Sequence, residues 1–376
     1  MGIEAAGWKD FCRRLEALGD DVEDAEGLSH LVEQVVCWLG WSVLHADARV
    51  PAFHRQNDLV TRWGGPNADN VYRHARLDPG RRYRVRGRMH SCEDFILAIR
   101  AGFMHMERWG TLTQVTASEL GIGPGDEFEL LLGGTAPGAI ALPEGAAMVS
   151  IREYYLDWVP REPAVITIEC LDDEGPARPL TGAALAAQLD DAAGHIEQSV
   201  GYWDRYLAEA RAQQIDNSFA PSIEVAKGLE AARYAYCFWN LAPGEALYVE
   251  GDVPAARYWS LQLYNLRWFE AFELNDRITT RNDRQMWIGD DGRVRAVVSH
   301  TDPGVPNWLD TGGRREGLLM LRWFWPTGDA PSPSARVVDA GAVGDEFPSD
   351  VPVIDTAGRA AERRARLDHL AWRFRT

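Results

Sequence analysis

Residues 293–325, RVRAVVSHTDPGVPNWLDTGGRREGLLMLRWFW, contain two strand-like runs and the loop that joins them. The first run places apolar side chains at every second position, at Val294, Ala296 and Val298. This is the period of a strand with one buried face, and His300 ends that face. The second run, residues 317–325, is apolar on both faces and predicts a central or sandwiched strand. The stretch therefore predicts a β-rich core with a polar loop at its edge.

A third run, residues 257–270, lies just upstream and alternates in the same way. Its apolar positions Trp259, Leu261 and Leu263 are interleaved with Ser260, Gln262 and Tyr264. In the first half, strand candidates occupy residues 81–89, 93–103, 126–132, 147–155 and 164–171. Turn sequences such as residues 78–80, Asp-Pro-Gly, separate them, and this spacing predicts antiparallel sandwiches or barrels rather than alternating strands and helices.

Helical periodicity marks four segments, at residues 8–18, 27–45, 181–213 and 357–374. The second has a broad apolar stripe formed by Leu28, Leu31, Val32, Val35, Val36, Leu39 and Val43. We expect this stripe to pack the N-terminal helices against the first sheet. The segment at 181–213 is the natural divider between two β-rich halves, and the last segment is a basic amphipathic helix.

The predicted fold class is α+β and β-rich: two antiparallel β-sandwich or barrel-like halves with N-terminal, linking and C-terminal helices. The expected regions are an N-terminal helical region at 1–50, a first β-rich domain at 51–178, linking helices at 179–222, a second β-rich domain at 223–340 and a C-terminal tail and helix at 341–376. A chain of 376 residues is long enough for two cores.

Composition narrows the classes of partner. A formal net charge of −17 would repel nucleic acid, which is bound through clustered Lys and Arg. No secretory leader and no apolar run long enough to span a bilayer is visible, so we expect a cytoplasmic protein without membrane attachment. The five cysteines are widely spaced and predict reduced core residues. Association with further copies of the chain stays open.

Three segments resemble the bacterial family of domain-of-unknown-function 1214. They are DNVYRHARLDPGRRYRVRGR at 69–88, ARYWSLQLYNLRWFE at 256–270 and VVSHTDPGVPNWLDTGGRREGLLMLRW at 297–323. The first half is similar to the 1254 domain that often precedes it. The resemblance implies a β-rich, two-part bacterial protein, and it implies no catalytic residue.

The loop after residue 299 holds the densest set of polar side chains, so it is the candidate site. His300 is the candidate acid or base and Asp302 the carboxylate that orients it, giving a pair suited to proton transfer near neutral pH. Candidate substrate-binding residues are Asn307, Trp308, Asp310, Arg322, Trp259 and Tyr264. The alternative is structural: a strand-end His bonded to its own loop, with Asn307 and Asp310 bonding local amides.

Arg322 lies on an apolar strand face, so its charge needs a partner. We expect an acid such as Asp302, Asp310 or Glu270, or else an anionic group of a ligand. The arginines at 82, 84, 86 and 88 line one strand face, which favours an outer face paired with Glu127 and Glu129 over an anion site. The polar segment WGGPNADNVY, residues 63–72, either lines a pocket or forms Asx turns.

Cofactor and metal motifs are missing from the sequence: no dinucleotide loop, P-loop, HExxH or GxSxG is present, so we expect no cofactor and no metal. Two functions remain. The first is cofactor-independent acid–base catalysis, by hydrolysis, elimination or isomerisation, on a small, largely apolar and in some cases anionic molecule. The second is binding of a lipid-like or carbohydrate ligand without turnover, favoured by the fifteen tryptophans.

Overall fold

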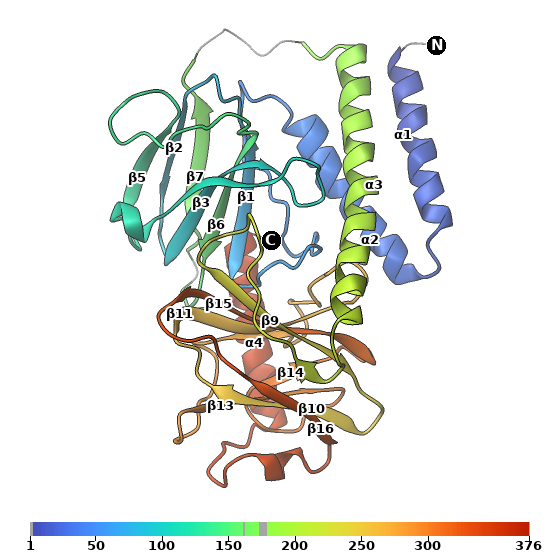
Figure 1. The fold of residues 1–376 in the computed structure, drawn as a ribbon, viewed down its shortest axis with the longest axis vertical. Helices are drawn as coiled ribbons and strands as arrows, with labels where there is room; N and C mark the ends of the chain where they lie inside the picture. Colours follow the sequence, from blue (N-terminus) through green and yellow to red (C-terminus); the bar gives the residue numbers. More distant parts are fainter. Residues whose placement is uncertain (1–2, 161, 173–178, 376) are drawn as a thin grey trace. The chain divides into compact units, whose positions relative to one another are not determined.

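A computed structural model describes residues 3–160, 162–172 and 179–375. The described residues divide into two compact units (Figure 1). The first contains those of 1–61, 70–155 and 162–203, and the second contains those of 62–69, 156–160 and 204–375. Two short segments of the second unit thus lie in sequence between parts of the first.

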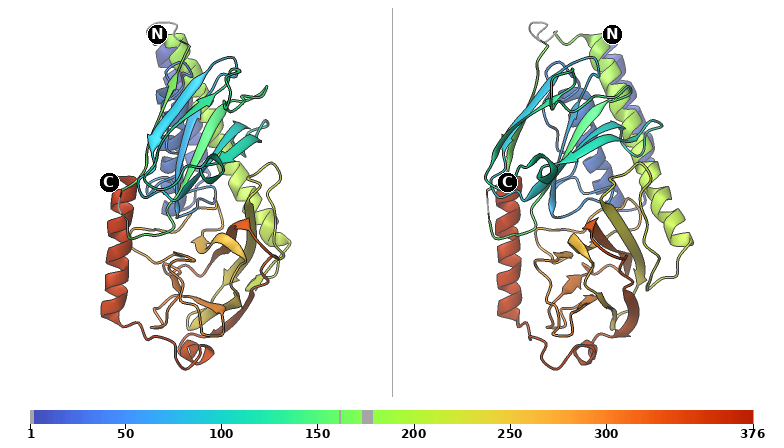
Figure 2. Two further views of the ribbon diagram at one scale, coloured as in Figure 1. Left: turned by 90° about the vertical axis from the view of Figure 1, so that its left-hand side faces the viewer. Right: turned by 60° about the vertical axis from the view of Figure 1, so that its left-hand side comes forward.

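Helices of the first unit are α1 (Ile3–Asp20), α2 (Ala25–Leu39) and most of α3 (Gly182–Ala212), whose last turns from Asp204 belong to the second unit. Helix α1 runs beside α3 in each view of Figures 1 and 2. A Cβ on Gly7 would lie 2.8 Å from that of Ala186, so glycine permits the close approach. Arg14 then binds Glu197 on α3, with Nε 2.7 Å from Oε1. The helices predicted at 8–18 and 181–213 are confirmed.

Two antiparallel sheets complete the first unit, in the strand orders β1-β6-β3-β4 and β5-β2-β7. Their strands are β1 (Asn70–Arg76), β2 (Tyr83–Arg88), β3 (Asp94–Gly102), β4 (Gly110–Thr116), β5 (Glu127–Leu132), β6 (Met148–Tyr154) and β7 (Val165–Cys170). The arginine row on β2 pairs with acids of the adjacent strands, as with Arg84 and Glu129 at 3.5 Å and Arg88 and Glu127 at 3.7 Å. The outer-face interpretation of that row is confirmed.

Helix α2 presents the opposite face to the one expected. Its buried residues are Gly27, His30, Glu33, Gln34, Cys37 and Trp38, while Leu28, Val32 and Val36 are exposed. The polar face can be buried because its groups bond one another: Trp38 Nε1 donates to Gln34 Oε1 at 2.7 Å. The Trp38 indole also stacks on His195 of α3, with ring centroids 4.4 Å apart. The expectation that the apolar stripe packs inward was wrong.

The second unit is a sandwich of two sheets, with strand orders β12-β11-β15-β9-β8 and β14-β13-β10-β16. Their strands are β8 (Ser218–Phe219), β9 (Ala232–Asn240), β10 (Glu245–Asp252), β11 (Ala256–Tyr264), β12 (Thr280–Asn282), β13 (Arg293–Ser299), β14 (Trp308–Asp310), β15 (Glu316–Pro326) and β16 (Ser334–Asp339). Pairing is antiparallel except between β13 and β14. The α+β, β-rich class is confirmed, no sheet of the described chain closes into a barrel, and β15 is central, as its apolar sequence predicts.

One core fills the space between these two sheets. It includes Trp259, Leu261 and Leu263 of β11, Leu319, Leu321 and Trp323 of β15, and Val294, Ala296 and Val298 of β13. The alternation in the sequence therefore identified the inward faces correctly. The opposite face of β11 carries Tyr258, Ser260, Gln262 and Tyr264, and it is buried as well. This second buried face is polar, so its hydrogen-bonding groups need partners.

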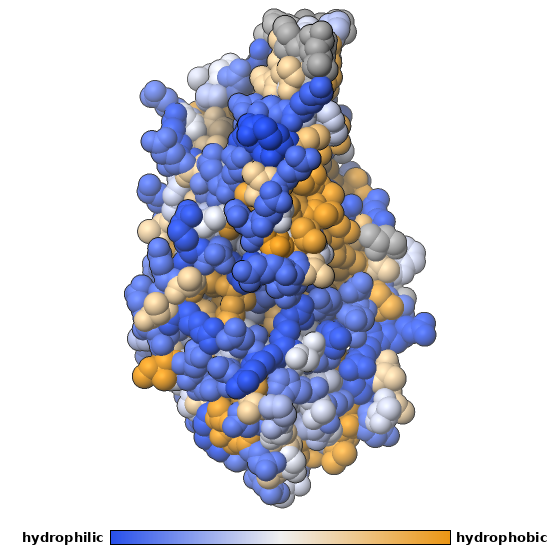
Figure 3. Space-filling view, turned by 90° about the vertical axis from the view of Figure 1, so that its right-hand side faces the viewer, coloured by the Kyte–Doolittle hydropathy of each residue, from blue (hydrophilic) through white to orange (hydrophobic). Residues whose placement is uncertain are grey.

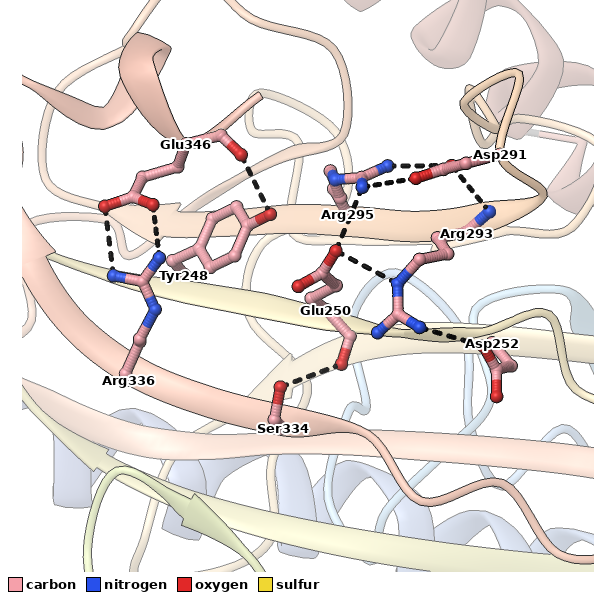
Figure 4. Close-up of polar contacts among 9 residues, drawn as sticks. All are labelled: Tyr248, Glu250, Asp252, Asp291, Arg293, Arg295, Ser334, Arg336 and Glu346. Atoms are coloured by element: carbon pink, nitrogen blue, oxygen red, sulfur yellow. Dashed lines mark hydrogen bonds and ion pairs between the residues drawn. The ribbon is translucent and has the colours of Figure 1, made fainter. Parts of the chain in front are cut away.

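The outer face of the β10, β13 and β16 sheet is a network of charges (Figure 4). Arg295 binds Asp291 and Glu250, at 2.6 and 3.0 Å, and Arg293 binds Glu250 at 3.0 Å. Beside them the Arg336 guanidinium lies over the Tyr248 ring, 4.9 Å from its centroid. In the described structure these guanidiniums form ion pairs with carboxylates, which indicates that this face stabilises the sheet rather than binding a ligand.

Helix α4 (Thr356–Phe374) closes the second unit and begins at Asp355, whose side chain accepts a hydrogen bond from the Gly358 backbone. The predicted C-terminal helix is confirmed. Its buried residues include Arg359, Arg366, His369 and Arg373, so the basic face is turned into the protein. Within the part of the chain that is described, no helix is both long and apolar enough to cross a membrane. The five cysteines are free thiols.

Candidate functional site

Among the described residues, the side chains of His300 and Asp302 bond other partners rather than each other. The ring of His300 places Nδ1 2.9 Å from Thr311 Oγ1. The carboxylate of Asp302 binds Arg359 of α4 at 2.8 and 3.0 Å and accepts from the Gly304 backbone at 3.0 Å. Arg359 holds the pKa of Asp302 below its usual value, against the burial that raises it. The geometry agrees with the structural alternative, and a catalytic role for this pair stays a prediction.

Three further predicted residues fix the loop. Asn307 is fully buried with a φ of 58°, and its Nδ2 donates to the carbonyls of Trp287 and Arg295, each at 2.7 Å. Trp308 is buried beneath the guanidinium of Arg359, which lies 5.2 Å from its ring centroid. Asp310 binds Arg277 at 3.2 Å and caps the Gly312 amide at 2.8 Å. All three therefore contribute contacts that hold the loop in place.

Arg322 is buried on β15 and donates to the Gly65 carbonyl at 3.2 Å and to the Tyr264 hydroxyl. Tyr264 in turn donates to the Pro66 carbonyl at 2.7 Å. Arg322 therefore helps to hold the segment at 62–69 on the polar face of the sheet, a role that the sequence did not indicate. Trp259 lies in the core between the sheets.

The segment at 62–69 ends in a buried carboxyl, Asp69, which is the centre of a polar network. Trp158 Nε1 and Asn282 Nδ2 donate to its Oδ1 at 2.8 and 2.7 Å, and the Tyr258 hydroxyl lies 2.6 Å from its Oδ2. Asp69 is 1% exposed. Burial raises the pKa of this carboxyl, although its hydrogen bonds and the charge of Arg373 oppose the shift.

Asp283 lies next to this network in sequence and in space. It follows Asn282, which is anchored both to Asp69 and to the Leu156 carbonyl at 2.9 Å. Burial raises the pKa of Asp283 to about 6, although the charge of Arg284 opposes the shift. Its Oδ1 is buried and accepts no hydrogen bond from the described residues, while the side chain as a whole remains 19% exposed. A carboxyl that titrates near neutrality and has a free oxygen is suited to proton transfer.

Arg366 of α4 provides a positive charge that interacts with the carboxyl of Asp69. Its guanidinium stacks over the Trp158 ring, 4.4 Å from the centroid, and Nη1 donates to Gln285 Oε1 at 3.2 Å. Its Nε and Nη2 are buried and have no hydrogen-bond partner in the described structure. Burial and the charge of Arg281 lower the pKa of Arg366 to about 10, still above neutrality. Trp158 thus links the carboxyl of Asp69 to a buried cation that retains bonding capacity.

Sequence reasoning missed most of this set. The WGGPNADN segment was singled out as polar, and its Asx turn is present, with the Asp69 amide donating to Asn67 Oδ1 at 3.1 Å. No signal pointed to Asp283 or Arg366, because an acid after a strand and an Arg on a basic helix are common on solvated surfaces. Among the described residues, no three or more His, Cys, Asp or Glu side chains are grouped to hold a metal ion.

A concavity lies at the C-terminal end of α3. It has a volume of about 730 Å³ and is lined by Leu207, Ala208, Arg211, Ala212, Gln214, Asp216, Leu266 and Glu316. Arg211 binds Asp216 at 2.7 Å and Glu316 at 2.9 Å across it. The guanidinium is therefore satisfied by protein carboxylates, which leaves the apolar side chains as the main contacts for a ligand.

The fold and these residues define an α+β, β-rich protein of two units with a buried acid and guanidinium site. Residues 245–328 match the family described as a protein of unknown function, DUF1214. This agrees with the resemblance drawn from the DPGVPNWLDT loop. The likeness of the first half to the 1254 domain stays a prediction.

A solved structure of an uncharacterised protein from Burkholderia cenocepacia is similar, with a TM-score of 0.82 and 28% identity, covering 89% of this chain and 97% of that one. A second, the VPA0106 protein from Vibrio parahaemolyticus, has a TM-score of 0.47 and 11% identity, covering 82% and 98% of the two chains. No curated protein matches the sequence significantly.

Proposed function

We propose that the second unit carries out cofactor-independent acid–base chemistry on a small anionic molecule. Asp283 is the proton-transfer group, and Arg366 holds the anionic part of the substrate. The observation that carries the proposal is the pair formed by a carboxyl with a pKa of about 6 and a buried guanidinium with two unused N–H groups. In this proposal the protein is a cytoplasmic bacterial enzyme acting by hydrolysis, elimination or isomerisation.

The proposed role of Asp283 follows from its protonation state near neutral pH. A general base is most effective when its pKa is near the working pH, since it is then both ionised and basic enough to accept a proton. Asp283 meets this condition, whereas an ordinary aspartate with a pKa of 3.8 would be a weak base. Its unbonded Oδ1 supports the same role. Asp69 is a positioning residue, because it anchors Asn282 and through it the backbone at Asp283.

The substrate class follows from Arg366. A guanidinium binds carboxylate through two parallel N–H bonds, and Nε with Nη2 forms one such donor edge. Both atoms lack a partner, so a carboxylate there would satisfy two buried donors at once. The ring of Trp158 is buried against Arg366, Arg373 and His369, so it offers the ligand no open apolar face. A small carboxylic acid fits these features.

Binding and proton transfer are tested separately. Thermal shift with benzoate, phenylacetate and pyruvate should show stabilisation of the wild type by at least one acid. That shift should be lost in Arg366→Met and kept in Arg363→Met, a partly exposed arginine of the same helix. Carbon-bound deuterium uptake by pyruvate in D2O, followed by NMR, should be catalysed by the wild type and lost in Asp283→Asn. Equal acid binding by both arginine variants would refute the site.

The second candidate is binding of a lipid-like or carbohydrate ligand without turnover. It is favoured by the concavity at the end of α3, whose volume of about 730 Å³ is in the usual range for ligand pockets. Ala212→Arg, at an exposed position of the lining, would fill this concavity without touching the Asp283 site. Loss of fatty acid or oligosaccharide binding in that variant, with no effect of Arg366→Met, would support this candidate over the first.

A further inference from the structure

Helix α2 carries an apolar stripe that the protein itself leaves uncovered. Leu28, Val32 and Val36 are 51%, 62% and 53% exposed, and Leu44 in the π-helical turn Gly40–Leu44 is 79% exposed. The partly exposed Leu31, Val35, Leu39 and Val43 lie along the same stripe. On the side of the molecule drawn in Figure 3, where α1 lies in Figure 1, hydrophobic residues gather in one continuous area.

This exposure is built into the helix rather than left over from weak packing. The polar side chains of α2 are the ones buried, and they are bonded there: Gln34 Nε2 lies 3.1 Å from His30 Nε2, and Gln34 Oε1 accepts a hydrogen bond from Trp38 Nε1. Rotating the helix to bury the stripe would break its contacts with other segments, the stack of Trp38 on His195 and the 3.7 Å contact of Cys37 Sγ with His54 Nε2. The two faces are therefore fixed, with the apolar one outward.

We propose that this stripe is an interface with a second copy of the chain, in which α2 packs against α2 of the partner. The spacing suits helix pairing: Leu28, Val32, Val35 and Leu39 are separated by four, three and four residues, the seam of two packed helices. From residue 28 to residue 44 the stripe runs about 24 Å at ~1.5 Å per residue. Such a seam is self-complementary about a two-fold axis.

The distribution of charge on α2 favours a second copy of the chain over other partners for the stripe. The chain has a net charge of −17, yet between residues 28 and 44 the only charged side chain is Glu33, which is buried. Two identical chains can therefore meet at this face without bringing like charges together. A membrane surface is disfavoured, because α2 has no Lys or Arg, the residues with which interfacial helices bind anionic lipid.

The exposed area of the stripe also agrees with a second copy of the chain as its partner. The stripe exposes on the order of 500 Å² of apolar surface, which is at the high end for a monomer. Paired stripes with their polar rims would bury on the order of 1,000 Å² or more in total, the lower limit for a specific interface. This interface does not depend on the acid–base site, whose residues are in the other unit.

Oppositely charged variants test the proposal. The full-length wild type should sediment as a dimer, while Val32→Glu/Val36→Glu and Val32→Lys/Val36→Lys should each sediment as monomers with unchanged circular dichroism. An equimolar mixture of the two variants should again form a dimer, because every contact across the axis then joins opposite charges. Leu120→Glu, at an exposed apolar position of the same unit away from α2, is the control and should stay dimeric.

Three results would overturn the proposal. They are a monomeric wild type, a dimer that persists in both charged variants, and a mixture that remains monomeric. Flotation with vesicles of phosphatidylcholine and phosphatidylglycerol distinguishes the lipid alternative. Flotation of a monomeric wild type that is lost in Val32→Glu/Val36→Glu would assign the stripe to a lipid surface instead of a second copy.

Discussion

The hydroxyl of Tyr258 lies 2.6 Å from Oδ2 of Asp69, and the same hydroxyl lies 2.9 Å from Asn67 Oδ1. A tyrosine has one hydroxyl hydrogen, so it can donate to only one of these two oxygens. Asn67 Oδ1 is held as an acceptor because it also receives the Asp69 amide. Both contacts are satisfied when Asp69 is protonated and donates to Tyr258, which then donates to Asn67. Burial, which raises the pKa of Asp69, favours this state.

A protonated Asp69 predicts that Asp69→Asn is well tolerated at pH 7. The amide can donate to Tyr258 and accept from Trp158 and Asn282, so the change in unfolding free energy should be under about 1 kcal/mol. Asp69→Ala should cost about 1–3 kcal/mol, since it leaves those buried donors without an acceptor. Urea unfolding at pH 7 compares them. Equal destabilisation by the two variants would mean that the carboxylate is ionised.

The raised pKa of Asp283 predicts that the stability of the protein changes between pH 4 and pH 7. Its pKa rises from 3.8 to about 6 on folding, so its contribution to stability is full below pH 3.8 and is lost as the pH rises through 6. Asp283→Asn should therefore raise the melting temperature at pH 7.5 and leave it nearly unchanged at pH 4. The control is Asp290→Asn, at an exposed position. A shift of equal size at both pH values would contradict the prediction.

Buried histidines predict that the first unit is sensitive to acid. Burial lowers the pKa of His105 to about 3 and that of His195 to about 4, and their rings are joined by a 2.9 Å contact. Their neutral forms give full stability above pH 6.5, and this is lost as the pH falls toward 4. In His105→Gln/His195→Gln the fall in melting temperature from pH 7.5 to pH 5 should be smaller.

Tryptophan fluorescence follows this transition, because Trp38 stacks on His195. His300→Gln, in the second unit, is the control and should keep the wild-type dependence on pH. Acid sensitivity that is unchanged in the double variant would assign the effect to other groups.

His300 and Arg322 should differ sharply in their effect on stability. His300 is partly exposed and bonded to Thr311, so His300→Ala should change the unfolding free energy by no more than about 0.5 kcal/mol. Arg322→Met should cost about 1–3 kcal/mol, because the buried Tyr264 hydroxyl and Gly65 carbonyl lose a donor. Melts and pyruvate deuterium exchange are measured together. Loss of pyruvate deuterium exchange in a His300→Ala variant of unchanged stability would support a catalytic role for His300.

Alternation in the sequence predicted which face of each central strand lies in the core. Trp259 and Leu321 lie in it as expected, because a period of two has only two faces and one of them was clearly apolar. For β15, apolar on both faces, the sequence also predicted its central place. The apolar residues on a strand's faces show which faces are buried, so the sequence of one strand indicates how it packs in the sheet.

The same reasoning failed for α2, and the reason is physical. Periodicity shows that a helix has an apolar stripe, but a stripe can be covered by the same chain or by another. The inward side was decided by specific contacts with other segments, such as the stack of Trp38 on His195 and the contact of Cys37 with His54, which have no periodic signature. Likewise Asp69 and Asn282 are 213 residues apart, so no local pattern could indicate their contact.

The second unit takes Asp69 and Trp158 from segments that precede most of its strands in the chain by many residues. Its polar face therefore forms only after loops of more than 80 residues have closed, and such long-range contacts slow folding. A nascent chain must keep these two segments available until Tyr258 and Asn282 have been synthesised. The unit is thus poorly suited to folding as a separate fragment, and residues 204–376 expressed alone would lack the groups that bond the polar face of β11.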